Sequence, residues 1–283
     1  MDLVIVSLVH QGPEMVYWMA KNIQKYVTGN FVWVVHYNGA EPLDTNKLPS
    51  WAWSVPSPIV TYGYTPRIAR AVAMCIDYAR SRTQFTNVLT MSSGSAFFRP
   101  YTVPNEERVQ FATYDPLFHP NGLRYHNEPI SVSELGRCGP YIEALGHPQK
   151  WQFEGFDAHS EIHERIRARG FEWIVGTQWS GQLIPYTPAI QFADDMLSTP
   201  LNGPPYAAEE ILMSTYSYNY ALRKPLPLWH SEAIIQWGPR YMITEYTRVE
   251  TYRNLCTVFP GMGHLVCKVP DDLTHPVRVF LTV

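Results

Sequence analysis

Two adjacent glutamates, Glu209 and Glu210, are candidates for a chemical role, because a carboxyl group can act as an acid or a base and both stand at the start of a predicted helix. They follow a proline-rich stretch and lie in the first turn of a predicted helix over 207–220, where the helix dipole favours a carboxylate whether or not it reacts. A carboxylate held close to a hydroxyl can also remove its proton as a general base. The sequence alone leaves both interpretations open, helix-start acids without a reactive role and a catalytic group.

Several common catalytic patterns do not occur in the sequence. It contains no GxxxxGK[ST] loop, no GxSxG elbow and no CxxC pair, and its single GxG, Gly261 to Gly263, lacks the third glycine of a dinucleotide-binding loop. These observations disfavour P-loop enzymes, serine hydrolases and Rossmann dehydrogenases. His159 and His163 lie one helical turn apart, but the order around them is not HExxH, so we interpret that segment as a charged helix face.

The composition excludes further classes. The chain has 283 residues, a formal net charge of -3 and 46% apolar residues, which are ample for a packed core and incompatible with disorder. No basic run exceeds the pair Arg223 and Lys224, so a nucleic-acid partner is not expected. The four cysteines are scattered, which fits reduced thiols in a cytosol, and no apolar stretch reaches membrane length.

The order of the expected elements predicts an α/β fold with a parallel, doubly wound sheet. Because ligands of open α/β sheets bind beyond the carboxyl ends of the strands, the loops at 10–13, 36–39, 62–65 and 92–99 are expected to converge on a cleft. A loop-rich region is expected over 100–150. Apolar periodicity predicts strands at 3–9, 31–35, 59–61, 87–91, 172–175, 255–259 and 277–283, and helices at 14–27, 66–82, 157–169, 188–197 and 207–220.

Segments spread over most of the chain resemble the inverting, GT-A-fold glycosyltransferases of the core-2 branching N-acetylglucosaminyltransferase and peptide O-xylosyltransferase family. The most specific match is 207–215, which is similar to the family's Pro-Asp-Glu-x-x-x-x-Thr helix start. Two family acids are replaced, by Asn38 and by Ala96. The other segments that resemble family motifs are 9–15 (His then Glu-Met), 36–38 (His-x-Asp), 89–100 (Gly-x-Asp-Phe-Pro), 176–179 (Gly-Ser-x-Trp) and 265–269 (Phe-Ala-x-Lys-Phe).

The resemblance implies a single GT-A domain over 1–283, built on a Rossmann-like mixed sheet flanked by helices. It has a nucleotide-binding half at 1–100 and an acceptor and catalytic half at 101–283. It implies transfer of xylose or N-acetylglucosamine from a UDP-sugar to a glycan hydroxyl, giving a β-linkage. Glu210 would be the general base. Because the sequence has no DxD motif, no metal is expected, and Lys268 with Arg253, or with Arg248 as a rival, would neutralise the departing diphosphate.

The remaining site residues follow from the same resemblance and from the predicted cleft. Serines and aromatic rings suit sugars and uracil, although a serine-rich turn explains the serines equally well and most aromatic residues are expected in the core. Arg253 is equally well explained as a solvated surface arginine. The donor-binding set is His10, His36, Asn38, Tyr62, Arg253 and Lys268, and the acceptor or sugar-binding set is Ser93, Ser95, Trp179 and Glu209.

Two other functions remain open at this level. The replaced acids also fit a catalytically inactive glycan-binding module, and Glu210 with Asp157 would form the carboxylate pair of a glycoside hydrolase. Because the family's membrane anchor does not occur in this sequence, we expect a soluble cytoplasmic protein. It would be bacterial, or encoded by a large virus and located in the host cytoplasm, or a trimmed form of an anchored enzyme.

Overall fold

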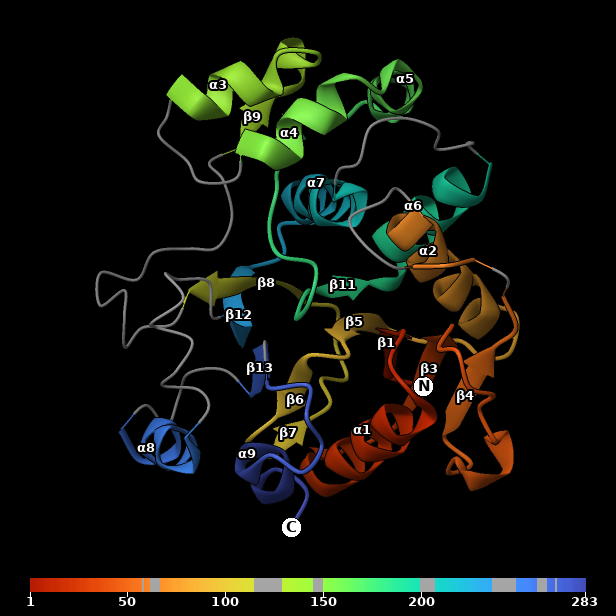
Figure 1. Cartoon of the computed structure of the whole chain (residues 1–283). Helices are drawn as coiled ribbons and strands as arrows, with labels where there is room; N and C mark the ends of the chain where they lie inside the picture. The colour runs from red at the N-terminus through yellow and green to blue at the C-terminus, as the bar shows by residue number, and fades with distance from the viewer. Residues whose placement is uncertain are drawn as a thin grey trace.

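The computed structural model describes residues 1–57, 59–61, 67–114, 129–144, 150–198, 207–235, 248–258, 264–267 and 269–283. Its architecture is mixed α/β, with helices on both faces of one large mixed sheet, and is compatible with a Rossmann-like fold (Figure 1). Helices cover both faces of this sheet, and further helices lie outside one of the two covering layers.

The bounds of the elements are as follows. The strands of the large sheet are β1 (Leu3–Val9), β3 (Phe31–Tyr37), β4 (Ala52–Val55), β5 (Asn87–Ser92), β6 (Ser95–Phe97), β8 (Val109–Tyr114), β11 (Leu183–Pro185), β12 (Leu228–Ile235) and β13 (Leu265–Cys267). Two small sheets pair β2 (Val27–Thr28) with β7 (Tyr101–Thr102), and β9 (Ile130–Ser131) with β10 (Trp173–Ile174). The helices are α1 (Pro13–Tyr26), α2 (Arg67–Arg80), α3 (Cys138–Ala144), α4 (Lys150–Asp157), α5 (Ser160–Ala168), α6 (Tyr186–Ser198), α7 (Ala208–Arg223), α8 (Val249–Val258) and α9 (Pro276–Phe280), with short 3-10 turns η1 (Thr45–Lys47) and η2 (Val132–Glu134).

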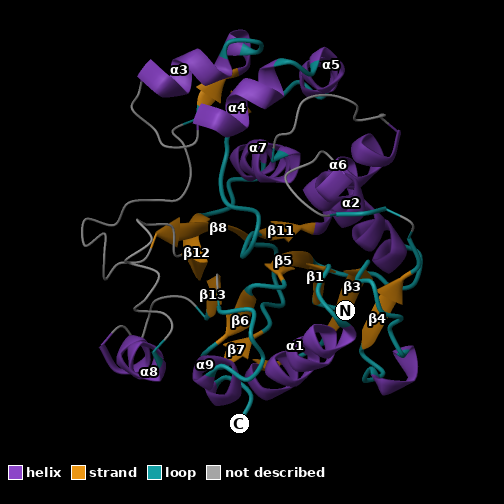
Figure 2. Ribbon diagram, viewed as in Figure 1, coloured by secondary structure: helices purple, strands orange, loops and turns teal. Residues whose placement is uncertain are grey.

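The large sheet has the strand order β4-β3-β1-β5-β11-β8-β12-β13-β6 (Figure 2). Strands β4, β3, β1 and β5 are parallel, as predicted. The sheet as a whole is mixed, as the resemblance implies, because β11 runs antiparallel to β5 and β8, and β6 runs antiparallel to β13. Strand β11 has only three residues and follows a tight turn at Gly181, whose φ is +85°. Three residues are too few to show a strand period in the sequence.

Strand β1 is buried along its whole length, because both faces of the sheet are covered. Val4, Val6 and Leu8 belong to the core on the α2, α6 and α7 face. Leu3 and Ile5 pack on the opposite face with residues of α1. Because alternate residues of β1 pack against the two covered faces, both sets must be apolar, and the strand contains few polar residues.

Three predicted strands are wrong. Residues 59–61 belong to no strand, and the edge strand is instead β4. The described part of 255–259 belongs to helix α8, and residues 277–280 belong to helix α9. The β-branched residues of 277–283 suggested a strand, but Pro276 at the first helical position and the side chain of His275, which accepts a hydrogen bond from Val277 N, start a helix there.

Two further expectations need correction. The predicted helix 157–169 is divided into the end of α4 and helix α5. Asp157 stands at this break and accepts hydrogen bonds from Cys138 N (2.9 Å) and Gly139 N (2.8 Å), so it caps helix α3. The region 100–150, expected to be loop-rich, contributes β8 to the large sheet.

The side chain of Asn22 closes one edge of the large sheet. Its Nδ2 donates to Phe97 O at 2.9 Å, and its Oδ1 accepts from Phe97 N at 2.8 Å. Asn22 thus occupies the hydrogen-bonding position of a further strand beside β6. Its Nδ2 also donates to Leu281 O at 3.0 Å, which ties α1 to the residue that follows α9.

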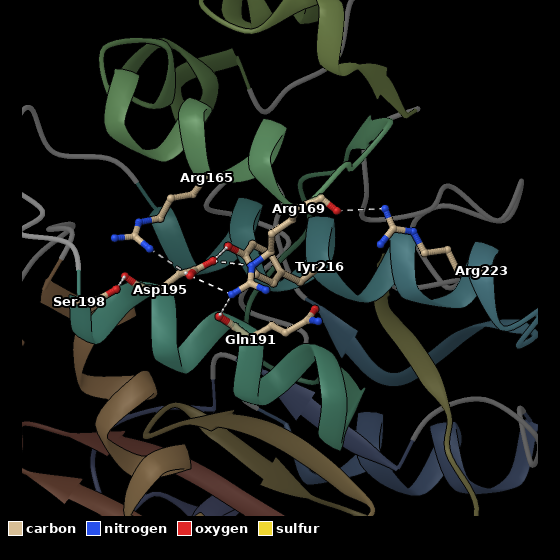
Figure 3. Close-up of polar contacts among 7 residues, drawn as sticks. All are labelled: Arg165, Arg169, Gln191, Asp195, Ser198, Tyr216 and Arg223. Carbon is tan, nitrogen blue, oxygen red and sulfur yellow. Dashed lines mark hydrogen bonds and ion pairs between the residues drawn. The ribbon is translucent and has the colours of Figure 1, made fainter.

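A buried carboxylate joins α5, α6 and α7 (Figure 3). Asp195 of α6 receives Arg169 Nε at 2.7 Å and Arg169 Nη2 at 2.9 Å, with Arg165 Nη1 at 3.3 Å. The hydroxyl of Tyr216 also donates to Asp195. Both carboxylate oxygens are therefore engaged, and the cluster is a structural connection between helices. Among the helices of the described ranges, none is both long enough and apolar enough to cross a bilayer.

The variant Asp195→Asn is expected to lower the free energy of unfolding by about 3 kcal/mol, because it leaves buried cationic and hydroxyl donors without their charged partner. Denaturant titration measures this change. The adjacent Asp194→Asn is the matched control, since Asp194 pairs with Arg80 at 2.8 Å while 51% of its side chain is exposed. That variant is expected to cost less than about 0.5 kcal/mol, and equal losses in the two variants would contradict the assignment.

Candidate functional site

The parallel strands β4, β3, β1 and β5 bring their carboxyl ends to one edge of the sheet. Val9 pairs with Tyr37, and Leu8 pairs with Ser92, so the segments after β1, β3 and β5 start side by side. The exposed His10 therefore lies at this edge. The topology brings three of the four expected loops together, and the fourth, with Tyr62, lies outside the described residues.

Asn38 and His36 occupy different environments at the end of β3. Asn38 Oδ1 accepts a hydrogen bond from Thr61 Oγ1 at 2.8 Å, and Asn38 N donates to Val9 O at 3.1 Å. His36 is fully buried, and neither of its ring nitrogens has a hydrogen-bond partner. Burial lowers the pKa of His36, which keeps the imidazole neutral at pH 7. Asn38 belongs to the rim of the edge, whereas His36 lies within the core beside it.

The segment 175–182 extends this edge towards helix α7. Gly181 N donates to Thr90 O at 2.6 Å, Thr90 N donates to Gln182 O at 3.0 Å, and Ser92 N donates to Ser180 Oγ at 3.2 Å. The hydroxyl of Thr90 also donates to the carbonyl of Trp179. The segment is thus joined to the last residues of β5, and Trp179, predicted to contact sugar, lies in it with 9% of its surface exposed.

The same segment is joined on its other side to α7. Thr177 N donates to Glu210 O at 3.0 Å, and Val175 N donates to Thr215 Oγ1 at 3.1 Å. The first turn of α7 is therefore connected to the carboxyl edge of the sheet through a short series of hydrogen bonds. Glu209 and Glu210 occupy that turn, as the sequence predicts.

Glu209 and Glu210 are both buried, with exposed fractions of 2% and 4%. Glu209 Oε2 has no hydrogen-bond partner. Burial and the neighbouring charge of Glu210 raise the pKa of Glu209 well above its ordinary value. Glu209 therefore keeps its proton to a higher pH than an ordinary glutamate does, beside a second carboxyl group in the same helical turn. A group with this perturbed pKa next to a sheet edge is a candidate for a functional role.

The turn between β5 and β6 holds both predicted serines. Ser93 and Ser95 are buried, and Ser95 Oγ shares a hydrogen bond with Ser92 Oγ at 2.8 Å. Val269 N donates to Gly94 O at 2.8 Å, and Cys267 pairs with Ser95, so the exit of β13 runs alongside this turn. Lys268 lies outside the described residues.

Arg253 lies on α8 with 62% of its side chain exposed. Its Nη1 is 3.4 Å from Glu250 Oε2, and its guanidinium carbon is 5.7 Å from the centre of the Phe280 ring. No contact that the structure describes joins Arg253 to the edge formed by β1, β3 and β5. Exposed ion pairs of this kind are weak, so the guanidinium can exchange Glu250 for another anion at small cost.

Within the described ranges, no group of three or more His, Cys, Asp or Glu side chains is arranged to hold a metal ion. His163 Nε2 contacts Phe156 O at 3.0 Å, and His159 Nδ1 contacts Glu161 at 3.2 Å, so these side chains have local partners. Asp157 has both oxygens engaged at the start of α3. The polar side chains of this segment therefore make structural contacts within and between helices α3, α4 and α5.

One residue of this region, Arg278, was not found from the sequence. It is fully buried in α9 and donates to Ser93 O, within the turn that follows β5. The only signal in the sequence is a basic residue inside the apolar run Val277 to Leu281. A single arginine carries little information until its tertiary contacts are known.

A scan against models of protein families found no match to this chain, and a search of curated proteins found no similar sequence. The function therefore has to be inferred from the residues and their geometry.

Replacing Glu209 by glutamine tests its protonation. The raised pKa means that the folded state holds a proton that the unfolded state releases above about pH 4.3. The stability of the wild type should therefore fall, relative to Glu209→Gln, as the pH rises from that value through the raised pKa of the folded state. Thermal unfolding between pH 4 and pH 9 measures the difference. The control is Glu172→Gln at an exposed position, and a constant difference for Glu209→Gln across the range would refute the assignment.

Proposed function

We propose that this protein is a metal-independent, inverting glycosyltransferase with a GT-A fold, which moves xylose or N-acetylglucosamine from a UDP-sugar to a glycan hydroxyl with a β-linkage. The observation that carries the proposal is the position of Glu210 in a buried helical turn whose backbone is hydrogen-bonded to the segment that continues the edge of β5. A mixed sheet with helices on both faces is compatible with the GT-A fold that the resemblance implies.

In the proposed mechanism Glu210 accepts the proton of the acceptor hydroxyl as its oxygen attacks the anomeric carbon. The bond between that carbon and the diphosphate oxygen breaks at the same time, so UDP leaves from the opposite face and the configuration is inverted. A hydroxyl is too weak a nucleophile unless its proton is being removed, which is why a carboxylate is required. We assign the negative charge of the pair to Glu210, because the raised pKa of Glu209 favours the protonated form of that residue.

The leaving diphosphate requires positive charge, which we assign to Lys268 with Arg253. Support for Lys268 comes from its neighbours, because Cys267 and Val269 pair with the turn that holds Ser93 and Ser95. We assign the second positive charge to Arg253, because its ion pair with Glu250 is exposed and the guanidinium can therefore reach a ligand.

Contacts with the sugar, the acceptor and the donor are assigned to side chains around the same edge. Ser93, Ser95 and Glu209 would bind the sugar or the acceptor by hydrogen bonds, and Trp179 would contribute an apolar face. His10 and Asn38 would contact the donor at the rim. A glycoside hydrolase built on Glu210 and Asp157 receives no support, since Asp157 caps helix α3 with both oxygens.

Matched glutamine substitutions in the first turn of α7 test the mechanism. Glu210→Gln is expected to lower sugar transfer by about a thousandfold or more while the Kd for UDP changes less than about threefold, because a general base acts only in the reaction. Glu209→Gln is expected to retain transfer within about threefold, because glutamine resembles the protonated acid that the raised pKa of Glu209 favours. UDP release from UDP-xylose or UDP-N-acetylglucosamine, with a glycan panel as acceptor and with or without EDTA, is the readout.

Three outcomes would contradict the proposal. Normal turnover by Glu210→Gln removes the assigned base, and inhibition by EDTA introduces a metal. Sugar release from a glycan without nucleotide indicates a hydrolase. Glycan binding by the wild type without UDP release in any combination of donor and acceptor favours the inactive binding module.

A further inference from the structure

Arg278 is a buried arginine whose hydrogen-bond acceptors are mainly backbone carbonyls. None of its side chain is exposed. Its Nε donates to Pro270 O at 2.6 Å, and its Nη2 donates to Ser93 O at 3.2 Å and Val269 O at 3.4 Å. The ring of Trp18 lies against it, with 4.1 Å between the guanidinium carbon and the ring centre. These groups solvate the cation in part, but none of them carries a negative charge.

The positive charge of Arg278 is poorly compensated within the described part of the chain. Asp271 Oδ1 lies 3.9 Å from Arg278 Nη2, and 69% of the Asp271 side chain is exposed. The buried Nη1 atom has no hydrogen-bond partner. Burial lowers the pKa of Arg278 to about 10, so the group remains charged at neutral pH. A buried cation without a close anion is costly, so a ligand that supplies negative charge near it would be favoured.

The carbonyls that Arg278 contacts belong to two neighbouring segments at the carboxyl edge of the sheet. Ser93 O lies in the turn after β5, and Val269 O and Pro270 O follow β13. The Val269 N to Gly94 O hydrogen bond joins the same two segments. Because a peptide group is planar and trans, the Gly94 N–H points away from the carbonyl that Arg278 holds. The guanidinium thus polarises this peptide so that its positive end faces the side opposite Arg278.

We propose that Arg278 is a positioning residue of an anion site at the turn Ser92–Ser95, where its buried charge and the peptide that it orients favour the diphosphate of a nucleoside diphosphate. The assignment of the diphosphate to a nucleotide rests on the proposed function. Arg278 acts through space and through the turn, because it has no exposed surface with which to touch a ligand. A charge fixed in a low-dielectric interior stabilises an anion more strongly than the same charge in water.

The experiment compares the binding of UDP and of uridine by isothermal titration calorimetry at pH 6.5. Arg278→Gln keeps a hydrogen-bond donor and removes the charge, whereas Arg278→Lys keeps the charge. Arg278→Gln is expected to weaken UDP binding at least tenfold and uridine binding less than twofold, and Arg278→Lys to remain within threefold of the wild type for both. Arg82→Gln, at an exposed arginine stacked on Tyr78 after α2, is the matched control and should change neither affinity.

Several results would overturn the inference. If the wild type binds UDP and the ratio of UDP to uridine affinity is unchanged in Arg278→Gln, the inference fails while the proposed function stands. Equal weakening of UDP and uridine, or equal losses in the glutamine and lysine variants, would show a purely structural role. If the wild type binds no UDP, the proposed function fails, and inorganic pyrophosphate then tests the anion site: binding that depends on Arg278 supports it, and absence of binding refutes it.

A measurement on the wild type covers the case in which Arg278→Gln does not fold. The Nε–H proton of a buried arginine is visible by NMR, and its resonance is assigned by its loss in Arg278→Lys. UDP should shift this resonance and uridine should not. Equal responses to the two ligands would refute the inference.

Discussion

The hydrogen bonds of residues 175–182 hold the candidate site together. On one side, Gly181 and Gln182 pair with Thr90 of the central strand β5. On the other side, Thr177 bonds to Glu210 at the start of α7. Because the backbone of one short segment satisfies partners on both elements, the first turn of α7 cannot move relative to the sheet edge without leaving buried polar groups unpaired. The burial of both glutamates depends on this connection.

The ionisable groups of the molecule separate into two kinds when their partners are compared. Asp195 is buried, yet arginines and a tyrosine engage both of its oxygens, so nothing remains for a ligand. Glu209 and Arg278 are also buried, but each keeps a polar atom without a partner. Unpaired buried atoms are costly and therefore rare in folded proteins. His36, at the end of β3, has the same property, so buried polar atoms without a hydrogen-bond partner occur at several points around this sheet edge.

The parts of the fold that the sequence predicts correctly are those with long, regular patterns. The continuous apolar run of β1, the amphipathic α2 and the helix that begins near Glu209 were all expected. The short strands β11 and β13 were missed, because three residues carry no period and their pairing is a tertiary property. Valines 277 and 279 suggested a strand, although the cap at His275 and the following proline start a helix.

The candidate site was predicted unevenly for the same reason. The turn with Glu209 and Glu210 and the turn with Ser93 and Ser95 lie at helix or strand ends, where sequence patterns are informative. Arg278 was missed because its importance comes from carbonyls eight and 185 positions away in the chain, at Pro270 and Ser93. Contacts at such separations have no signature in a single sequence.

The first and last helices of the described chain are in direct contact. Trp18 Nε1 donates to Arg278 O at 3.1 Å, Asn22 Nδ2 donates to Leu281 O at 3.0 Å, and Lys25 Nζ donates to Phe280 O at 3.3 Å. During translation the ribosome releases α9 after every other helix and strand described here. The side chains of Asn22 and Trp18 in helix α1 therefore lack these acceptors until α9 has been synthesised. A nascent chain that lacks residues 276–281 also lacks the Arg278 donors to Ser93 O and Pro270 O, so the contacts behind the turn after β5 form only once α9 has emerged.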